Sequence, residues 1–413
     1  MSNTPNIRFA GFTGAWKQRK CGDVLIERNI QHPKSDEFPL VSFTVENGVT
    51  PKTDRYEREQ LVRGDKKEKK YKETRIDDIV YNPANLKFGA IARNKYGNAV
   101  FSPIYVTYEV KRDLALPSFI EMVVTRESFI QNALQYQQGT VYERMAVNTD
   151  DFATLDIMLP SKEEQTKIGE MLSDLDTLIT LHQRKCDETK KLKKYMLKKM
   201  FPQNGALIPE IRFAGFTDAW EQRKLNSLMD FSNGFNGSST LYGTGIPYIS
   251  VMDILNNDFI TYECIRGKVN IDEQTLKRFA VDYGDVLFQR SSENVEDAGS
   301  SNVYLGNKTA AFGGFVIRGK KKSEYDGFFI KNLLDSETVR KQITSKAQGA
   351  QHINVSQETL SDVIVSIPSI EEQVSIGKLF ASINETITLH QRKCDELKDV
   401  KKYMLQNMFP QKG

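Results

Sequence analysis

The chain carries two histidine–cysteine pairs whose spacing could bind a metal ion. His182 and Cys186 are four residues apart, as are His390 and Cys394, so each pair would lie on one face of a helix. Two such pairs meeting across two helices would supply the four ligands of a tetrahedral zinc site. Antiparallel helices need not bring the pairs together, so we favour the alternative of a polar layer with two buried thiols. No metal ligand is assigned.

Other patterns that could support catalysis are incomplete. Gly306–Thr309 (GNKT) lacks the upstream glycine spacing of a phosphate-binding loop. Asn82–Asn85 (NPAN) begins like an amino-methyltransferase motif but lacks the aromatic residue that would stack a flipped base, and we interpret it as a turn. His32 and His352 are the only histidines outside the repeated helices described below, and no serine lies in a nucleophile elbow. The sequence therefore predicts a binding protein and no catalytic residues.

Polar loops carry the side chains that read base edges in DNA, where Arg and Lys suit guanine and Asn and Gln suit adenine. The candidates in the first half of the chain are Arg93, Asn94, Lys95, Asn98, Gln137, Gln138, Tyr142 and Arg144. The candidates in the second half are Gln289, Arg290, Ser292, Asn294, Asn302, Gln348, Gln351, His352 and Asn354. Four lysines of a charged run are candidates for phosphate contacts, which position a protein without specifying sequence: Lys66, Lys67, Lys69 and Lys70.

These loops belong to a chain that is built twice. IRFAGFTGAWKQRK begins at Ile7 and IRFAGFTDAWEQRK at Ile211, while ITLHQRKCDE occurs identically at Ile179 and Ile387. Internal repeats of this kind fix the architecture. The segments between the repeats differ, so a shared scaffold presents two different polar surfaces. We predict a bivalent binder with four parts: residues 1–158, 159–205, 206–366 and 367–413.

Composition sets broad limits on the fold and the location. The 413 residues suffice for two to three domains, and 57 basic against 54 acidic residues give a net charge of only +3. That balance neither requires nor excludes nucleic acid. The sequence shows neither an apolar run of membrane-spanning length nor a signal pattern. Its four cysteines do not form a disulfide framework, so we expect a reduced, cytoplasmic protein.

The segments between the repeats mix strands with helices, which indicates an α+β fold with a strongly bent sheet. Turn residues and alternating apolar residues predict a helix over Phe119–Ala133 and strands over Phe38–Val45, Leu86–Ala92, Ala99–Val110, Ile246–Asp253, Asp285–Gln289 and Thr309–Arg318. The aromatic residues of each lead-in, such as Trp16 and Trp220, are expected to pack on the domain that follows.

Each repeat ends in a long predicted helix. Ser161 and Ser369 follow a proline and precede a glutamate by three residues, which is a capping box. Pro202 and Pro410 should end the helices. Apolar residues at alternating spacings of three and four predict a coiled coil, with seams Ile168, Leu172, Leu175, Ile179, His182, Cys186, Thr189, Lys193, Met196, Met200 and Ile376, Phe380, Ile383, Ile387, His390, Cys394, Leu397, Lys401, Met404, Met408. The two helices are expected to pair antiparallel, giving an internal pseudo-two-fold repeat.

The whole chain resembles the specificity subunits of type I restriction–modification enzymes. The resemblance rests on PSxxEQ at Pro160–Gln165 and Pro368–Gln373, the repeated ITLHQRKCDE helix and the repeated lead-in. It also rests on Gly284–Ser292 (GDVLFQRSS) and Phe312–Lys320 (FGGFVIRGK), which are similar to parts of the family's target-recognition domains. The first half lacks a GDVL strand of the usual form, and its nearest match is Phe88–Ala92 (FGAIA).

This resemblance implies two target-recognition domains that each read one half of a split DNA target. The helices would set the gap between the halves and dock two methyltransferase subunits, which bind S-adenosylmethionine and methylate adenine at N6. Restriction and translocase subunits would add ATP- and Mg-dependent cleavage. This chain would bind double-stranded DNA and those subunits, hold no cofactor itself and contact no membrane.

Two other classes of function stay open on the sequence alone. A coiled-coil scaffold carrying two adaptor domains would bind proteins and show no salt-sensitive preference for a gapped DNA sequence. An enzyme fused to its own specificity module would need a cofactor loop, which the sequence lacks.

Overall fold

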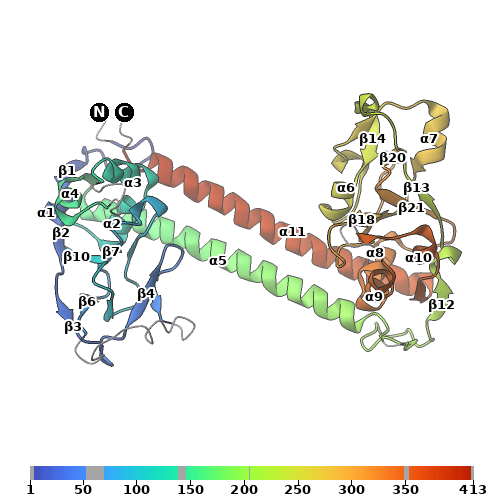
Figure 1. Ribbon diagram of the computed structural model, residues 1–413, viewed down its shortest axis with the longest axis horizontal. Helices are drawn as coiled ribbons and strands as arrows, with labels where there is room; N and C mark the ends of the chain where they lie inside the picture. Colours follow the sequence, from blue (N-terminus) through green and yellow to red (C-terminus); the bar gives the residue numbers. More distant parts are fainter. Residues whose placement is uncertain (1–3, 53–68, 138–145, 204, 348–352, 411–413) are drawn as a thin grey trace. The chain divides into compact units, whose positions relative to one another are not determined.

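The computed structural model describes residues 4–52, 69–137, 146–203, 205–347 and 353–410. The chain forms two compact units, one of Met1–Thr180 with Asp395–Gly413 and the other of Leu181–Cys394. Each unit therefore contains one lead-in, one variable segment and parts of both long helices (Figure 1). The boundary between the units falls within both helices rather than at their ends, so each unit includes part of each helix.

The first unit is built around a four-stranded sheet of order β2-β10-β7-β8, with a smaller β3-β6-β9 sheet beside it. Its elements are β1 (Lys17–Lys20), α1 (Cys21–Val24), β2 (Leu25–Glu27), β3 (Gln31–His32), β4 (Val41–Thr44), β5 (Gly48–Pro51), β6 (Tyr71–Thr74), β7 (Ile79–Tyr81), η3 (Leu86–Phe88), β8 (Ile91–Arg93), β9 (Ala99–Phe101), β10 (Val106–Val110), α2 (Pro117–Val124), α3 (Glu127–Leu134), α4 (Thr149–Thr154), β11 (Asp156–Leu159) and α5 (Lys162–Lys199), which continues into the second unit.

The second unit repeats the four-stranded sheet as β13-β21-β17-β19. Its elements are β12 (Glu221–Lys224), η4 (Leu225–Ser227), β13 (Met229–Asn233), η5 (Ser239–Leu241), β14 (Tyr242–Ile249), α6 (Val251–Leu255), η6 (Tyr262–Cys264), β15 (Lys268–Val269), α7 (Glu273–Phe279), β16 (Ala280–Val281), β17 (Val286–Gln289), β18 (Ser291–Ser292), β19 (Ser301–Val303), β20 (Ala310–Phe312), β21 (Val316–Lys321), α8 (Gly327–Asp335), α9 (Glu337–Lys346), β22 (Ile353–Asn354), α10 (Gln357–Ser361), β23 (Ile364–Ile367) and α11 (Ile370–Asn407), which continues into the first unit.

The predicted α+β class and the two long helices are confirmed, each helix having 38 residues. The helices are antiparallel within each unit. In the first unit Lys401 Nζ lies 2.6 Å from Asp176 Oδ1, and in the second the His182 and His390 Nδ1 atoms are 3.0 Å apart. Every predicted seam residue is buried or half-buried. The spacing of apolar residues therefore identified the paired faces correctly.

The capping boxes are only half formed, because the glutamates have other partners. Ser161 Oγ accepts a hydrogen bond from the Glu164 N–H at 3.3 Å, but the Glu164 carboxylate receives two hydrogen bonds of 2.6 Å from Arg8. Arg212 and Glu372 form the same pair in the second unit, at 2.7 Å. Each lead-in is thereby bound to the start of the helix in its own half of the chain.

The lead-in aromatic residues pack as predicted. Trp16 is 2% exposed and its ring lies 5.8 Å from those of Phe119 and Phe409. Trp220 is 1% exposed and lies 5.8 Å from Phe329. Burial of a tryptophan at this position anchors the lead-in in each unit.

Several predicted elements are broken by turns. Ala99–Val110 and Thr309–Arg318 each form two strands rather than one, and the predicted helix over Phe119–Ala133 is two helices, α2 and α3. The strand predicted over Ile246–Asp253 ends at Ile249 and continues as α6, while the predicted strand over Leu86–Ala92 begins only at Ile91. In each case an apolar run continues through a change of direction, so periodicity alone did not reveal the turn.

Candidate nucleic-acid interface

Each unit contains an equivalent central strand, and the sequence analysis matched the two strands wrongly. β7 and β17 occupy the same place in their sheets. Asp77 (φ 72°) and Gly284 (φ 90°) both adopt the left-handed conformation just before the strand. The Asp77 N–H donates to the Asn94 carbonyl, and the Gly284 N–H donates to the Tyr304 carbonyl, both at 2.8 Å. The first-half match to the GDVL strand is therefore DDIV beginning at Asp77, and the match to Phe88–Ala92 was wrong.

A buried aspartate follows in each unit. Asp78 and Asp285 are 2% exposed, and each accepts a hydrogen bond from a backbone N–H of the preceding turn. Burial raises the pKa of both carboxyl groups, and in the first unit the Arg28 guanidinium, 2.8 Å from Asp78, opposes that shift. These carboxylates hold the turn at the start of β7 and of β17. They thereby help to fix the strand whose other end leads into the candidate loop.

The second-unit candidates gather where β17 ends. Gln289 is 5% exposed and donates to the Ser291 carbonyl at 2.9 Å, while Arg290 is half-buried. Ser292 is buried and accepts from the Asn294 N–H. The exposed Asn294 exchanges hydrogen bonds of 2.9 Å with Asp297. Polar side chains thus gather at the end of β17, but several of them already form hydrogen bonds within the unit.

The remaining described candidates of the second unit differ in exposure. Asn354 is exposed on β22 and accepts from Ser291 Oγ at 2.5 Å, which links β22 to the loop after β17. Asn302 is fully buried, and its amide donates to the carbonyls of Ile254 and Asn257. Asn302 therefore connects β19 to α6 and to the segment that follows it, and offers no exposed amide in this structure.

In the first unit the candidate loop is largely bound to its own domain. Arg93 lies 2.5 Å from Asp77 and 3.0 Å from Glu121. Asn94 is fully buried and bonds to the turn around it. Lys95 pairs with Glu121 at 2.9 Å but is 63% exposed, and Asn98 is exposed. Gln137 lies elsewhere, after α3, and is half-buried.

The other candidates lie partly outside the described residues. Gln138, Tyr142, Arg144, Gln348, Gln351, His352, Lys66 and Lys67 belong to the undescribed ranges. Lys69 and Lys70 are exposed just before β6. Lys72 of the same charged run is 4% exposed and pairs with Glu27 at 2.9 Å, so the run ends inside the fold.

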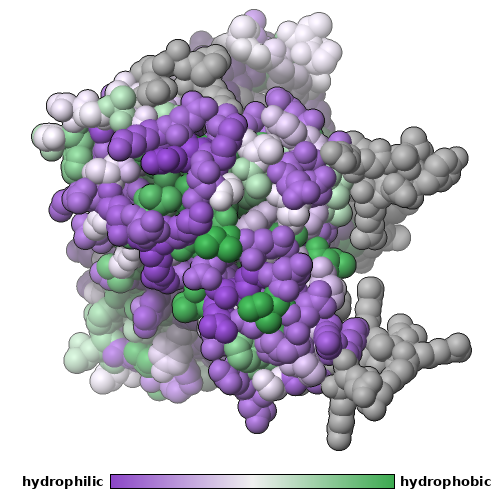
Figure 2. Space-filling view, turned by 90° about the vertical axis from the view of Figure 1, so that its left-hand side faces the viewer, coloured by the Kyte–Doolittle hydropathy of each residue, from purple (hydrophilic) through white to green (hydrophobic). Residues whose placement is uncertain are grey.

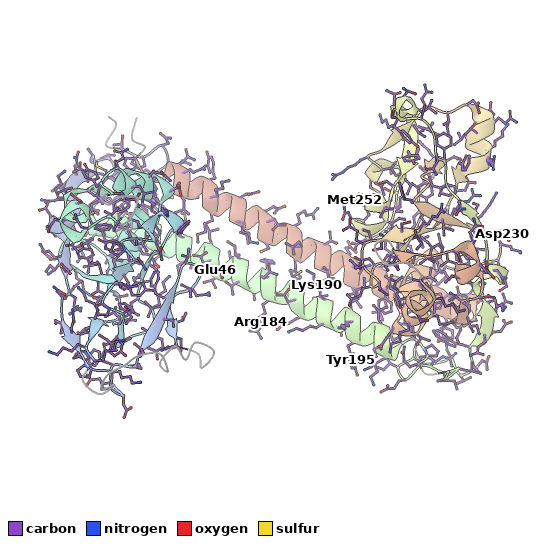
Figure 3. All side chains as sticks on the ribbon, in the orientation of Figure 1. Glu46, Arg184, Lys190, Tyr195, Asp230 and Met252 are labelled. Atoms are coloured by element: carbon purple, nitrogen blue, oxygen red, sulfur yellow. The ribbon has the colours of Figure 1, made fainter. Side chains whose placement is uncertain are left out.

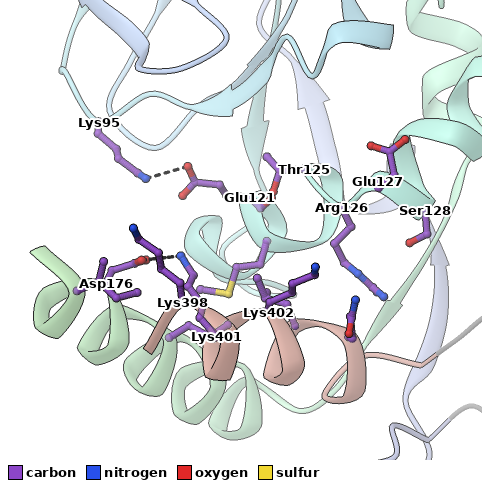
Figure 4. Close-up of a pocket in the computed structure, with 15 residues that line it drawn as sticks. Lys95, Glu121, Thr125, Arg126, Glu127, Ser128, Asp176, Lys398, Lys401 and Lys402 are labelled. Carbon is purple, nitrogen blue, oxygen red and sulfur yellow. Dashed lines mark hydrogen bonds and ion pairs between the residues drawn. The ribbon is translucent and has the colours of Figure 1, made fainter. Parts of the chain in front are cut away.

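A cavity of about 850 Å³ lies in the first unit between α2, α3, the N-terminal half of α5 and the end of α11 (Figure 4). Its charged side chains include five basic residues, Lys95, Arg126, Lys398, Lys401 and Lys402. Dashed lines in Figure 4 mark two of its ion pairs, Lys95–Glu121 and Lys401–Asp176. These pairs offset much of the positive charge, so the cavity is not a strongly basic groove.

The face of the first unit seen in Figure 2 is mainly hydrophilic, with hydrophobic residues in small separate groups. Large single apolar side chains are nevertheless exposed in both units, on short helices (Phe88, 63%, and Met252, 61%) and in turns (Ile104, 58%, and Phe315, 68%). Their exposure could not be predicted from the sequence, because each lies in or beside an apolar run typical of a core strand or helix.

The histidine–cysteine layer contains internal contacts of its own. Cys186 Sγ lies 3.7 Å from Gln391 Oε1, and Cys394 Sγ lies 3.6 Å from Gln183 Oε1. The two contacts are equivalent, because each joins the cysteine of one repeat to the same glutamine of the other repeat. Within the described ranges, three or more His, Cys, Asp or Glu side chains are nowhere grouped as a metal site. The pairs form a polar layer between the helices.

Two sheet domains with unlike polar loops on one repeated helical scaffold define a bivalent binding subunit. Comparison with known families is specific. Residues 16–191 and 217–399 match the family described as type I restriction modification DNA specificity domain. The chain belongs to this family, which identifies it as a specificity subunit rather than a methyltransferase or nuclease subunit.

Individual relatives are distant. The type I restriction enzyme MjaVIII specificity subunit of Methanocaldococcus jannaschii is 21% identical over 75% of this chain and 69% of its own length. A protein assigned as the MjaX specificity subunit of the same organism is 23% identical over 67% of this chain, and the match spans 63% of that protein, less than two thirds. The solved type I S subunit from M. genitalium shares the fold, with a TM-score of 0.59, 14% identity and coverage of 99% of this chain and 100% of that one.

Among the described residues, none of the helices has the length and apolar character needed to cross a bilayer.

Proposed function

We propose that this chain recognises a bipartite, gapped DNA target and directs adenine-N6 methylation and restriction by partner subunits in the cytoplasm. The repetition of one sheet with different loops carries this proposal. β7 and β17 hold equivalent places, yet they lead into loops of different length and composition. Two readers on a fixed scaffold gain affinity from each other only when the two half-sites have the right spacing.

Each unit would read one half-site through the loops at the ends of its central strands. In the second unit the accessible candidates are Arg290, Asn294 and Asn354, and in the first they are Lys95 and Asn98. Lys69 and Lys70 would contact phosphates and so add affinity without specificity. Asn94 and Asn302 would act by shaping the loops, since their amides are used inside the fold.

The helices would dock the partner subunits. α5 and α11 expose large apolar side chains away from their seams: Leu181 (44%), Leu192 (45%), Tyr195 (51%) and Leu389 (51%) in the second unit, and Leu178 (42%), Val400 (42%) and Tyr403 (55%) in the first. Tyr195 projects away from α5, as does Arg184 (Figure 3). Exposed apolar surface that recurs in both repeats suits two copies of one partner.

Those partners would be two methyltransferase subunits, which bring S-adenosylmethionine, together with restriction and translocase subunits, which bring ATP and Mg. This chain would supply recognition alone. Recognition by this chain can then be measured from the DNA sequence that the assembled enzyme methylates.

A methylation map with an exchanged domain tests the proposal. N6-methyladenine would be mapped across the genome of cells that carry the wild-type chain, a deletion, or a chain whose residues 225–366 come from another family member. We expect a split motif that vanishes on deletion and changes in one half only after the exchange. A motif that changes in both halves, or one that persists after deletion, would contradict independent reading by the two units.

A further inference from the structure

The second unit has a largely apolar cavity beside the candidate base-reading residues. It measures about 650 Å³ and lies between α6 and the turn Gly313–Phe315 that joins β20 to β21. Its apolar wall includes Tyr248, Met252, Leu255, Phe315 and Val316, and Gln289 contributes a polar side chain. Met252 is 61% exposed and Phe315 68%, and Met252 lies on the surface of α6 in Figure 3. The cavity is therefore open to a large ligand.

Gln289, which lines this cavity, has an unused acceptor. The side chain is 5% exposed, and its Nε2 donates to the Ser291 carbonyl at 2.9 Å. Its Oε1 is buried and finds no donor in the part of the chain that the structure describes. A buried acceptor without a donor lowers the stability of the free protein. A ligand that donates an N–H to this oxygen would supply the missing hydrogen bond and so bind more tightly.

The first unit exposes an apolar side chain at the equivalent position. Val106 lies opposite Tyr81 on β7, and Ile317 lies opposite Phe288 on β17. Ile104 lies two residues before Val106 and is 58% exposed, and Phe315 lies two residues before Ile317 and is 68% exposed. Single apolar side chains are exposed on most folded proteins, but here the exposure recurs at the same turn in both units. The recurrence is consistent with a shared role in contact with the ligand.

We propose that the Phe315 cavity receives the major-groove edge of one A·T base pair in the half-site read by the second unit. Gln289 Oε1 accepts a hydrogen bond from the adenine N6 amine, and Phe315 with Met252 contacts the thymine C5 methyl. Ile104 makes the corresponding apolar contact in the other half-site. This assignment rests on the proposed function and names the base pair and the side chains that read it.

The chemistry of the cavity favours this base pair over the others. In the major groove an acceptor can pair with the amine of adenine or of cytosine. Both pairs present two acceptors and one amine donor in the major groove, but only the A·T pair adds a methyl group, on thymine, that can pack against the apolar wall. The rim carries two carboxylates, Glu293 and Asp297, which would repel a backbone phosphate. The cavity therefore suits a base edge.

The test uses the full chain assembled with its methyltransferase subunits and duplexes containing its mapped target. Each thymine is replaced singly by deoxyuridine, which lacks only the C5 methyl, and each adenine by purine, which lacks the N6 amine. Binding is measured for wild type, Phe315→Ala, Gln289→Leu and Ile104→Ala. Tyr283→Ala is the matched control, since Tyr283 is an aromatic residue of the same unit, 61% exposed, before the opposite end of β17.

At one A·T pair we expect deoxyuridine to weaken wild-type binding about four-fold, as for one buried methyl. Purine at the same pair should weaken it by about ten-fold or more. Phe315→Ala should abolish the deoxyuridine effect at that pair, Gln289→Leu the purine effect, and Tyr283→Ala neither. Ile104→Ala should abolish a deoxyuridine effect in the other half-site only.

The inference fails if Phe315→Ala keeps the full thymine preference at every position, or lowers affinity equally for all duplexes. A Gln289→Leu complex that still discriminates every adenine from purine would also overturn it. A wild-type complex without sequence preference in either half would instead refute the proposed function, and the inference would fall with it.

Discussion

Replacing Arg212 with alanine should destabilise the second unit by about 3–5 kcal/mol. Glu372 is 1% exposed, and Arg212 reaches it with two hydrogen bonds of 2.7 Å. Removing the guanidinium leaves a buried carboxylate without its counter-charge, which is the costly way to break a buried ion pair. Arg212→Ala with Glu372→Gln should recover part of the loss, because a neutral amide is cheaper to bury than a carboxylate.

The first unit provides a matched comparison. Arg8 and Glu164 form the same pair, but Trp16 Nε1 also lies 3.4 Å from Glu164. Trp220 Nε1, at the equivalent position, is buried and has no hydrogen-bond partner among the described residues. Arg8→Ala should therefore cost about 1–2 kcal/mol less than Arg212→Ala, since one donor to the carboxylate remains.

Tryptophan fluorescence separates the two effects, because the chain has two tryptophans and each unit contains one. In a Trp16→Phe background, urea unfolding followed by fluorescence reports on Trp220. With a slope of about 1–3 kcal/mol per M, Arg212→Ala should lower the midpoint by more than about 1 M. A loss below about 1 kcal/mol, or a double variant as unstable as Arg212→Ala, would refute the argument from the buried charge.

Further predictions concern the helices. Gly377→Ala should destabilise the second unit by about 1–3 kcal/mol in the same urea assay, because a Cβ there would clash with the Asp326 carboxylate that caps α8. Gly169→Ala, with only one contact at 3.9 Å, should be neutral or stabilising when Trp16 reports on the first unit in a Trp220→Phe background. The pKa of His182 is lowered by desolvation and then by the neighbouring His390, so the folded state favours the neutral ring. Stability should be full above about pH 6.5 and fall as pH drops through the lower folded pKa, and replacing both histidines with glutamine should flatten the pH dependence of the urea midpoint. Removing one heptad from each of α5 and α11, at facing positions, should shorten the gap in the methylated motif and leave both half-sites unchanged; altered half-sites would count against a spacing role.

The helices could be predicted from sequence because their signals are local and repeated. Proline marks their ends, and seam residues such as Ile168 and Cys186 recur every three or four positions. The strands were harder to delimit. Thr309–Arg318 is apolar almost throughout, and only Gly313 and Gly314 indicate the turn that divides it.

The candidate site was predicted less well, for a physical reason. An amide in a polar loop can bind a ligand or stabilise its own turn, and the sequence does not distinguish the two. Asn94 and Asn302 are fully buried and bond to nearby carbonyls. Ile104 and Phe315, which belong to the proposed base contact, were not among the sequence candidates for the converse reason, since an apolar residue in an apolar run is usually part of the core.

The equivalent residues at the ends of β7 and β17 show how one scaffold can carry two readers. Asn82 and Gln289 hold the same sheet position, and their N–H groups donate over 2.9 and 2.8 Å to the returning strand segment. Asn82 Oδ1 accepts from the Ala84 N–H at 3.1 Å and so closes its own turn. The side chain of Gln289 is one methylene longer, and its Oε1 remains unpaired beside the cavity, as far as the described residues show. On the assignment proposed above, a change of one residue at this position converts a turn-forming amide into a recognition group, while the equivalent strand keeps its place in the sheet.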